Sequence, residues 1–206
     1  MPRTVDTEAR RRRIADAVRA LADEHGLEGV TLRDVAARAG VSMGAVQRCF
    51  RTKDEMLRFA LTEVGERIGT RVRAGAGIPS APGSLTGLAR AVTEVALVDP
   101  ADSADARVWL SFVAQAAVTD SLAAVLRADY AELEELFVRL LLRAAGPDGD
   151  REAEAVREAR ALLALADGLT MHVLVGHRTS EEAGEVVRTQ LAALESRFIT
   201  HTSGSE

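Results

Sequence analysis

Cysteine is almost absent from this sequence: Cys49 is the only one in 206 residues. A single thiol cannot form an internal disulfide or a thiolate zinc cluster, and such usage is typical of a reducing compartment. The four histidines are scattered, so we expect no metal site and no cofactor. No apolar run approaches the roughly 18 residues of a membrane span, and no signal-peptide pattern follows the N-terminal arginines. We therefore expect a cytoplasmic protein without a membrane partner.

Aromatic residues are also scarce, at 3% of the chain, although hydrophobic residues make up 47%. The bulk is Ala, Leu, Val, Arg and Glu, a composition that favours helices over strands. Apolar spacing and turn residues predict an all-α fold of about nine helices, at 7–24, 31–39, 42–49, 53–73, 85–98, 104–119, 121–145, 151–175 and 180–199. The Gly- and Pro-rich stretch 75–84 is predicted to be a loop or linker.

Lysine is nearly missing as well, since Lys53 is the only lysine among 26 basic residues. The net charge of −5 at first disfavours a nucleic-acid partner, but the charge is distributed unevenly. Residues 1–60 hold 12 basic and 9 acidic side chains, net +3, while the remainder holds 14 and 22, net −8. This split suits a DNA-facing N-terminal part and an acidic body turned away from phosphates.

The window LRDVAARAGVSMGAVQRCFR, residues 32–51, has the pattern of two short helices crossing at a steep angle. Ala36 is small enough for the crossing, and Gly40 tolerates the positive φ of a tight turn. Thr31, Ser42 and Thr52 are expected to cap successive helices. The inward positions are predicted to be Val35, Ala39, Val41, Val46 and Cys49, with Phe50 and Phe59 also in the core. The sequence thus predicts a three-helix helix-turn-helix domain over residues 1–52, followed by a helical domain over 53–206 that the helix from 53 bridges.

The second helix of this motif is the predicted recognition helix, because its outward residues are small or polar. Gln47 and Arg48 can pair with adenine and guanine edges, and Lys53 at a helix start can hold a phosphate. The predicted DNA contacts are Thr31, Arg33, Ser42, Met43, Gly44, Gln47, Arg48, Arg51 and Lys53. The basic run Arg10–Arg13 either meets the DNA backbone or forms a solvated face.

The segment VTLRDVAARAGVSMGAVQRCFRTKDEML resembles the N-terminal signature of the TetR family of transcriptional regulators, over about Arg10 to Leu61. Seven positions fall in register with that signature: Gly40, Val41, Ser42, Gly44, Phe50, Lys53 and Leu57. Gln47 and Cys49 stand where the family usually has Tyr and His, so the phosphate contact of that tyrosine is lost or taken by Gln47. The DNA sequence preference of other members is therefore not transferable.

The resemblance implies a helical C-terminal domain that binds a small-molecule effector and dimerises through the last two helices. In that architecture the helix over 104–119 borders a cavity, with 164–176 similar to the penultimate helix of one subgroup. The predicted effector-binding residues are Trp109, Phe112, Val113, Gln115, Ala116, Met171 and His172. The predicted dimer interface, taken from the apolar excess of the last two helices, comprises Leu162, Leu165, Ala166, Leu169, Val187, Leu191 and Leu194.

The resulting hypothesis is a homodimeric repressor that binds a palindromic operator in double-stranded DNA and is released by an unknown effector, with the helix from Lys53 acting as a lever. An enzyme is disfavoured because no paired carboxylates, activated nucleophile or metal-ligand spacing stands out. An adaptor with a filled C-terminal core, binding DNA or a partner without an effector, is the other reading.

Overall fold

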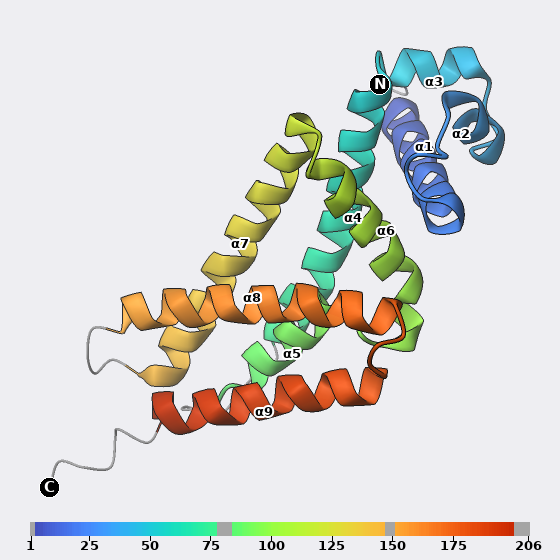
Figure 1. Ribbon diagram of the computed structural model, residues 1–206. Helices are drawn as coiled ribbons and strands as arrows, with labels where there is room; N and C mark the ends of the chain where they lie inside the picture. Colours follow the sequence, from blue (N-terminus) through green and yellow to red (C-terminus); the bar gives the residue numbers. More distant parts are fainter. Residues whose placement is uncertain (1–2, 78–83, 147–150, 200–206) are drawn as a thin grey trace, which may run out of the picture. The chain divides into compact units, whose positions relative to one another are not determined.

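The computed structural model describes residues 3–77, 84–146 and 151–199 (Figure 1). Within these ranges the chain forms nine α-helices, a short 3-10 helix at Pro100–Asp102 and no strand, which confirms the all-α prediction. The α-helices are α1 (Arg3–His25), α2 (Leu32–Arg38), α3 (Met43–Cys49), α4 (Lys53–Ala76), α5 (Thr86–Ala96), α6 (Ser103–Ala116), α7 (Asp120–Ala145), α8 (Glu152–Leu174) and α9 (Ser180–Ile199). None of these helices has the length and apolar character needed to cross a bilayer.

Hydroxyl side chains determine where α2, α3 and α4 begin. Thr31, Ser42 and Thr52 each accept a hydrogen bond from the amide three residues later, at 3.2, 3.2 and 3.0 Å. These bonds satisfy amides that the first turn of a helix leaves without a carbonyl partner. Gly40 separates α2 from α3 with φ +63°, a left-handed conformation that glycine adopts without steric cost. The predicted caps and the predicted turn are therefore confirmed.

Three predicted boundaries differ from the structure by three residues or more. Helix α6 ends at Ala116, before the expected residue 119. Helix α1 begins at Arg3, earlier than the expected residue 7. Helix α4 continues to Ala76 and so includes the start of the stretch expected to be a linker, because glycine inside a helix is only a weak breaker. Residues 78–83 of that stretch lie outside the described ranges.

The chain divides into two compact units. Unit 1 takes in the described residues of Met1–Arg67 and Ala104–Ala128, and unit 2 those of Ile68–Ser103 and Asp129–Glu206. Helices α4 and α7 each contribute to both units.

In unit 1, α1 packs against both α2 and α3 (Figure 1). The core side of α1 is fully buried at Ile14 and Val18, and α2 meets it with Val35, which is also fully buried. Two ion pairs connect α1 to α6: Arg107 Nε lies 2.6 Å from Asp23 Oδ1, and Arg19 lies 3.4 Å from Asp105 Oδ1. The helix-turn-helix thus rests on a closed apolar core that α1 completes.

An exposed pair joins α1 to the end of α2. The Arg38 guanidinium donates two hydrogen bonds to the Glu24 carboxylate, at 2.7 and 2.6 Å, and these lower the pKa of Glu24. Because the folded-state pKa is depressed, the pair stabilises the fold above the unfolded-state pKa, and this contribution is lost as the pH falls through the folded-state pKa. We expect Arg38→Gln to raise the Glu24 pKa, as measured by carboxyl NMR titration. An unchanged Glu24 pKa would contradict this assignment.

Unit 2 is built around α5, which packs against α8 and α9 (Figure 1). Its buried face, including Leu88, Ala91 and Val92, is covered by the apolar faces of those two helices. Thr170 is the buried polar residue of this core, and its hydroxyl lies 2.6 Å from the Ala96 carbonyl, where α5 ends. The apolar sides of α8 and α9 are therefore used within the chain itself.

Candidate nucleic-acid interface

Helix α3 packs against the rest of unit 1 through its inner side. Ala45, Val46 and Cys49 are buried, and α3 contacts both α1 and α2. Phe50, directly after the helix, is 2% exposed. Of the five predicted inward positions, four are buried as expected and Val41 is half-buried. This seating fixes which side of α3 is available to a partner.

The outer side of the motif carries the predicted DNA contacts. Eight of these nine residues are exposed, and Gly44 is half-buried. Met43 is 42% exposed, which is unusual for a large apolar side chain and would suit a thymine methyl group. A guanidinium nitrogen of Arg48 lies 3.6 Å from where a Cβ on Gly44 would stand, so the arginine extends along the same face. The outer side of the motif is therefore a polar face with one exposed apolar side chain, that of Met43.

The start of α4 adds an exposed cation beside this face. Lys53 is exposed at the first position of the helix, where backbone amides favour an anion. The two acidic residues that follow are already engaged. Asp54 accepts hydrogen bonds from Arg58 and from the Ser121 hydroxyl, and Glu55 accepts the Arg51 amide hydrogen bond at 2.9 Å. The negative charge of these two carboxylates is therefore partly compensated beside Lys53.

Two arginines of the basic run of α1 make contacts within unit 1 that neither prediction from sequence included, whereas Arg12 is exposed. Arg11 donates to the Cys49 carbonyl at 3.2 Å, and Arg13 donates to the Ala39 carbonyl at 2.8 Å, so each ties α1 to the end of a motif helix. Arg12 lies 3.7 Å from Glu8 and 3.9 Å from Glu63. The sequence contained no signal for this, because a run of arginines does not reveal which carbonyls tertiary packing brings within reach.

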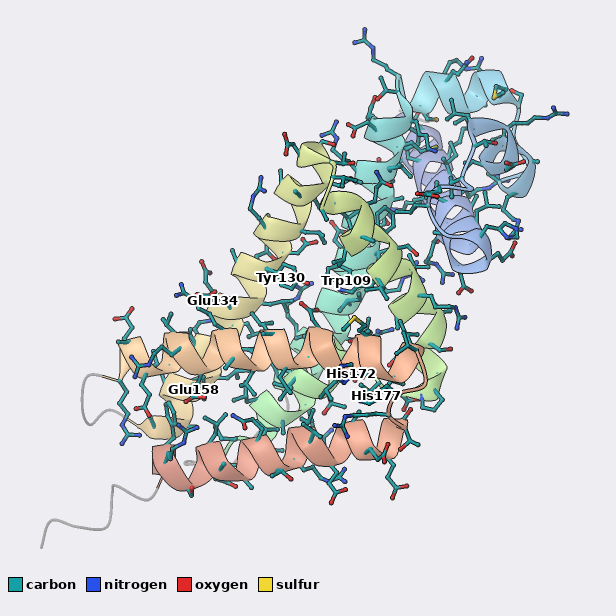
Figure 2. The ribbon with its side chains drawn as sticks, viewed as in Figure 1. Trp109, Tyr130, Glu134, Glu158, His172 and His177 are labelled. Carbon is teal, nitrogen blue, oxygen red and sulfur yellow. The ribbon has the colours of Figure 1, made fainter. Side chains whose placement is uncertain are left out.

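The predicted effector-binding residues fall on two helices, five on α6 in unit 1 and two on α8 in unit 2. On α6, Trp109, Phe112 and Ala116 are buried and the other two are half-buried; the Gln115 amide donates to the Thr119 hydroxyl at 2.9 Å. Met171, on α8, is 44% exposed. His172 lies edge-on to His177 with 4.9 Å between ring centroids, and both are labelled with Trp109 in Figure 2.

The residues predicted for the dimer interface lie mostly inside unit 2. Leu165 is half-buried, and the other six, Leu162, Ala166, Leu169, Val187, Leu191 and Leu194, are at most 6% exposed. They face the core built around α5, so little of their surface is left for a second chain. The prediction did not allow for α5 as the element that covers these faces.

An apolar stripe follows the second half of α8 on its exposed side, beyond the exposed charged residues Arg157 and Arg160. What we call the α8 stripe comprises four residues of the helix and the residue directly after it, at alternating spacings of three and four: Ala161, Ala164, Gly168, Met171 and Val175. Met171 and Val175 are 44% and 69% exposed, and a Cβ on Gly168 would meet no atom within 4 Å. Sequence reasoning overlooked this stripe because its small residues add little to an apolar count.

Two family profiles match the chain. The profile described as bacterial regulatory proteins of the tetR family matches residues 14–59, the helix-turn-helix and the start of α4. The profile described as the C-terminal part of BetI-type transcriptional repressors matches residues 86–195, more than half of the chain. The two matches together include every α-helix from α1 to α9 in whole or in part.

Individual relatives agree with these profiles. The HTH-type transcriptional regulator PksA of Bacillus subtilis is 32% identical over 85% of this chain and 83% of its own length. A transcriptional regulator from a Rhodococcus species has a solved structure with TM-score 0.78 and 32% identity, over 89% of this chain and 95% of that one. A Saccharomonospora viridis structure, described as a regulator in complex with choline, matches in fold with TM-score 0.76 and 22% identity, over 87% of this chain and 93% of that one. This chain, which is not an enzyme, therefore belongs to the TetR family of bacterial transcriptional regulators.

Proposed function

We propose that this regulator represses transcription by binding a palindromic operator as a homodimer, and that a small molecule bound by its C-terminal helices releases it. The observation that carries the proposal is the seating of α3. Its inner side is buried against α1 and α2, while Gln47 and Arg48 project from the outer side. A helix held in this way can enter the major groove.

The other predicted contacts complete the proposed interface. Thr31 and Arg33 at the start of α2, with Lys53 at the start of α4, are placed to meet phosphates on either side of the groove. Base edges are read by α3, so sequence preference resides in that helix and not in the flanking cations. We retain the functional division at residue 53, with DNA binding before it and effector binding and dimerisation after it.

The dimer is proposed to form through the α8 stripe in place of the buried leucines predicted from sequence. Exposed apolar residues at alternating intervals of three and four form the seam of a helix pair, and small residues let two helices approach closely. A second copy is the occupant we propose, because a two-fold dimer presents two recognition helices to the two halves of a palindrome.

Effector binding is proposed to involve the α6 residues from Trp109 to Ala116. Met171, which was predicted from sequence to bind the effector, is assigned instead to the proposed dimer contact. The Saccharomonospora viridis protein that holds choline supports small-molecule binding by this fold. An effector must bind the released form more tightly than the operator-bound form, because a ligand with equal affinity for both does not change the equilibrium between them. We propose that it does so by changing the separation of the two recognition helices.

Operator binding is tested with DNA from the promoters next to the regulator's own gene. We expect a mobility shift that survives excess non-specific competitor, and a footprint of two half-sites related by symmetry about one helical turn or more apart. A protein that shifts none of these fragments, or that protects one half-site only, would rule out the proposed dimeric repressor.

Effector release is tested by thermal-shift screening, with choline among the first compounds, because a ligand that binds only the folded state raises the melting temperature. A compound that binds should weaken the operator complex in the same mobility-shift assay. Equal operator affinity with and without every compound that binds would favour a regulator whose DNA binding is independent of these ligands.

A further inference from the structure

Arg11 of α1 makes contacts with the end of α3 and with α4. Its guanidinium donates a hydrogen bond to the Cys49 carbonyl at 3.2 Å. The guanidinium carbon also lies 4.5 Å from the ring centroid of Phe50 and 4.5 Å from that of Phe59. The two rings contact each other, with centroids 5.5 Å apart. One side chain therefore joins three segments of the DNA-binding unit.

These contacts suit an arginine better than any other residue. The Cys49 carbonyl belongs to the last turn of α3, where the helix dipole favours a positive charge. A planar guanidinium can stack on an aromatic ring while its edge donates hydrogen bonds, which a lysine ammonium cannot reproduce. Glu55 of α4 lies 3.8 Å from the same guanidinium nitrogen of Arg11 that donates to the Cys49 carbonyl, and it adds an opposite charge.

The same contacts leave Arg11 poorly placed to bind DNA. Its side chain is only 27% exposed, against 63% for the neighbouring Arg12. Its Nε is buried and finds no hydrogen-bond partner among the described residues, as expected for a guanidinium lying against rings. The positive charge of Arg11 is therefore directed into the protein.

We propose that Arg11 is a positioning residue for operator recognition, which holds the C-terminal end of α3 at a fixed place relative to the start of α4. This inference rests on the proposed DNA-binding function. Gln47 and Arg48 read bases from α3, whereas Lys53 meets phosphate from α4, so both sets of contacts form together only if the two helices keep their spacing. Arg11 bridges the junction between them.

The test compares Arg11→Met and Arg11→Lys with the matched control Arg12→Met. The methionine removes charge and hydrogen bond but keeps an apolar side chain against the rings, and the control removes the same charge from an exposed neighbour. We expect Arg11→Met to weaken operator binding about tenfold, in line with the loss of a charge-assisted hydrogen bond. Binding to unrelated DNA, which depends on phosphates, should match that of the control.

Two readouts separate positioning from a phosphate contact. Loss of a phosphate contact lowers the slope of log affinity against log salt by about 1. We expect Arg11→Met and Arg12→Met to have the same slope on unrelated DNA. We also expect Arg11→Lys to bind the operator no better than Arg11→Met. The proposal would be overturned if Arg11→Lys bound the operator more tightly than Arg11→Met. It would also be overturned if the salt slope fell for Arg11→Met alone, or if Arg11→Met bound the operator as tightly as the control Arg12→Met.

A measurement without DNA keeps the inference separate from the proposed function. Hydrogen exchange of the α3 amides in the free protein should be faster in Arg11→Met than in Arg12→Met, whether or not an operator is found. If Arg11→Met fails to fold, Arg11→Lys and Phe59→Leu provide the same test. In the Phe59→Leu background the effect of Arg11→Lys on α3 exchange should shrink, because one stacking partner is already gone. The proposal would be overturned if α3 amides exchanged at the same rate in Arg11→Met and Arg12→Met. It would also be overturned if the effects of Arg11→Lys and Phe59→Leu on α3 exchange were simply additive.

Discussion

Replacing Gln47 and Arg48 together by alanine is expected to weaken operator binding at least about a hundredfold, because each well-formed bidentate contact to a base contributes roughly 1–3 kcal/mol of discrimination. Both side chains are exposed on α3, and neither is part of the buried contact with α1 and α2. The fold should survive, since alanine is a strong helix former. Fluorescence anisotropy at one fixed salt concentration measures the loss.

The matched control is Arg127→Ala on α7, an exposed arginine of the same unit that carries the same charge. It should bind the operator within about twofold of the unmodified protein, since distant surface charges are largely screened. The double variant should keep its weak affinity for unrelated DNA, which the phosphate contacts supply. Operator affinity that is unchanged in the double variant would mean that α3 is not the helix that reads the sequence.

A glutamate on the α8 stripe is expected to separate the proposed dimer. Ala164→Glu places a carboxylate at an exposed position of the stripe, where the two-fold axis of the proposed dimer would bring the same residue of the second chain close. Like charges facing each other across an interface cost several kcal/mol, so we expect the dimer to weaken at least about a hundredfold. Sedimentation equilibrium measures this, and operator affinity should fall with it because the two half-sites are no longer bound by one linked pair.

Ala131→Glu on α7 is the control, since it adds the same charge at an exposed alanine of the same unit. It should leave both the dimer and operator binding intact. A dimer of unaltered strength in Ala164→Glu would place the interface elsewhere on the chain.

Much of the fold follows from local sequence signals. The hydroxyls of Thr31, Ser42 and Thr52 each precede a run with helical spacing, and each caps the helix that follows. Gly40 marks the turn of the motif because the left-handed conformation there is costly for other residues. Such signals act over three or four residues, so they are fully visible in one sequence. The exposure of the α3 outer face follows from the same spacing.

Signals that depend on distant partners were not visible. The periodicity of Leu162 and Leu194 indicates that a face is apolar, but it does not say whether α5 or a second chain covers it. For the same reason Arg11 and Arg13 read as surface charges, although each finds a carbonyl in a segment 38 or 26 residues away. Periodicity gives the direction of a side chain, whereas its partner is decided by the packing of the whole unit.

Because Cys49 is buried, the labelling rate of its thiol can report on the motion of α3. Its thiol is the only one in the sequence, and it is 7% exposed on the inner side of α3. A thiol-specific reagent can reach the sulfur only when α3 lifts away from its support, so the labelling rate in native buffer counts those openings. Each chain then yields one signal, from the helix of interest, without an engineered probe.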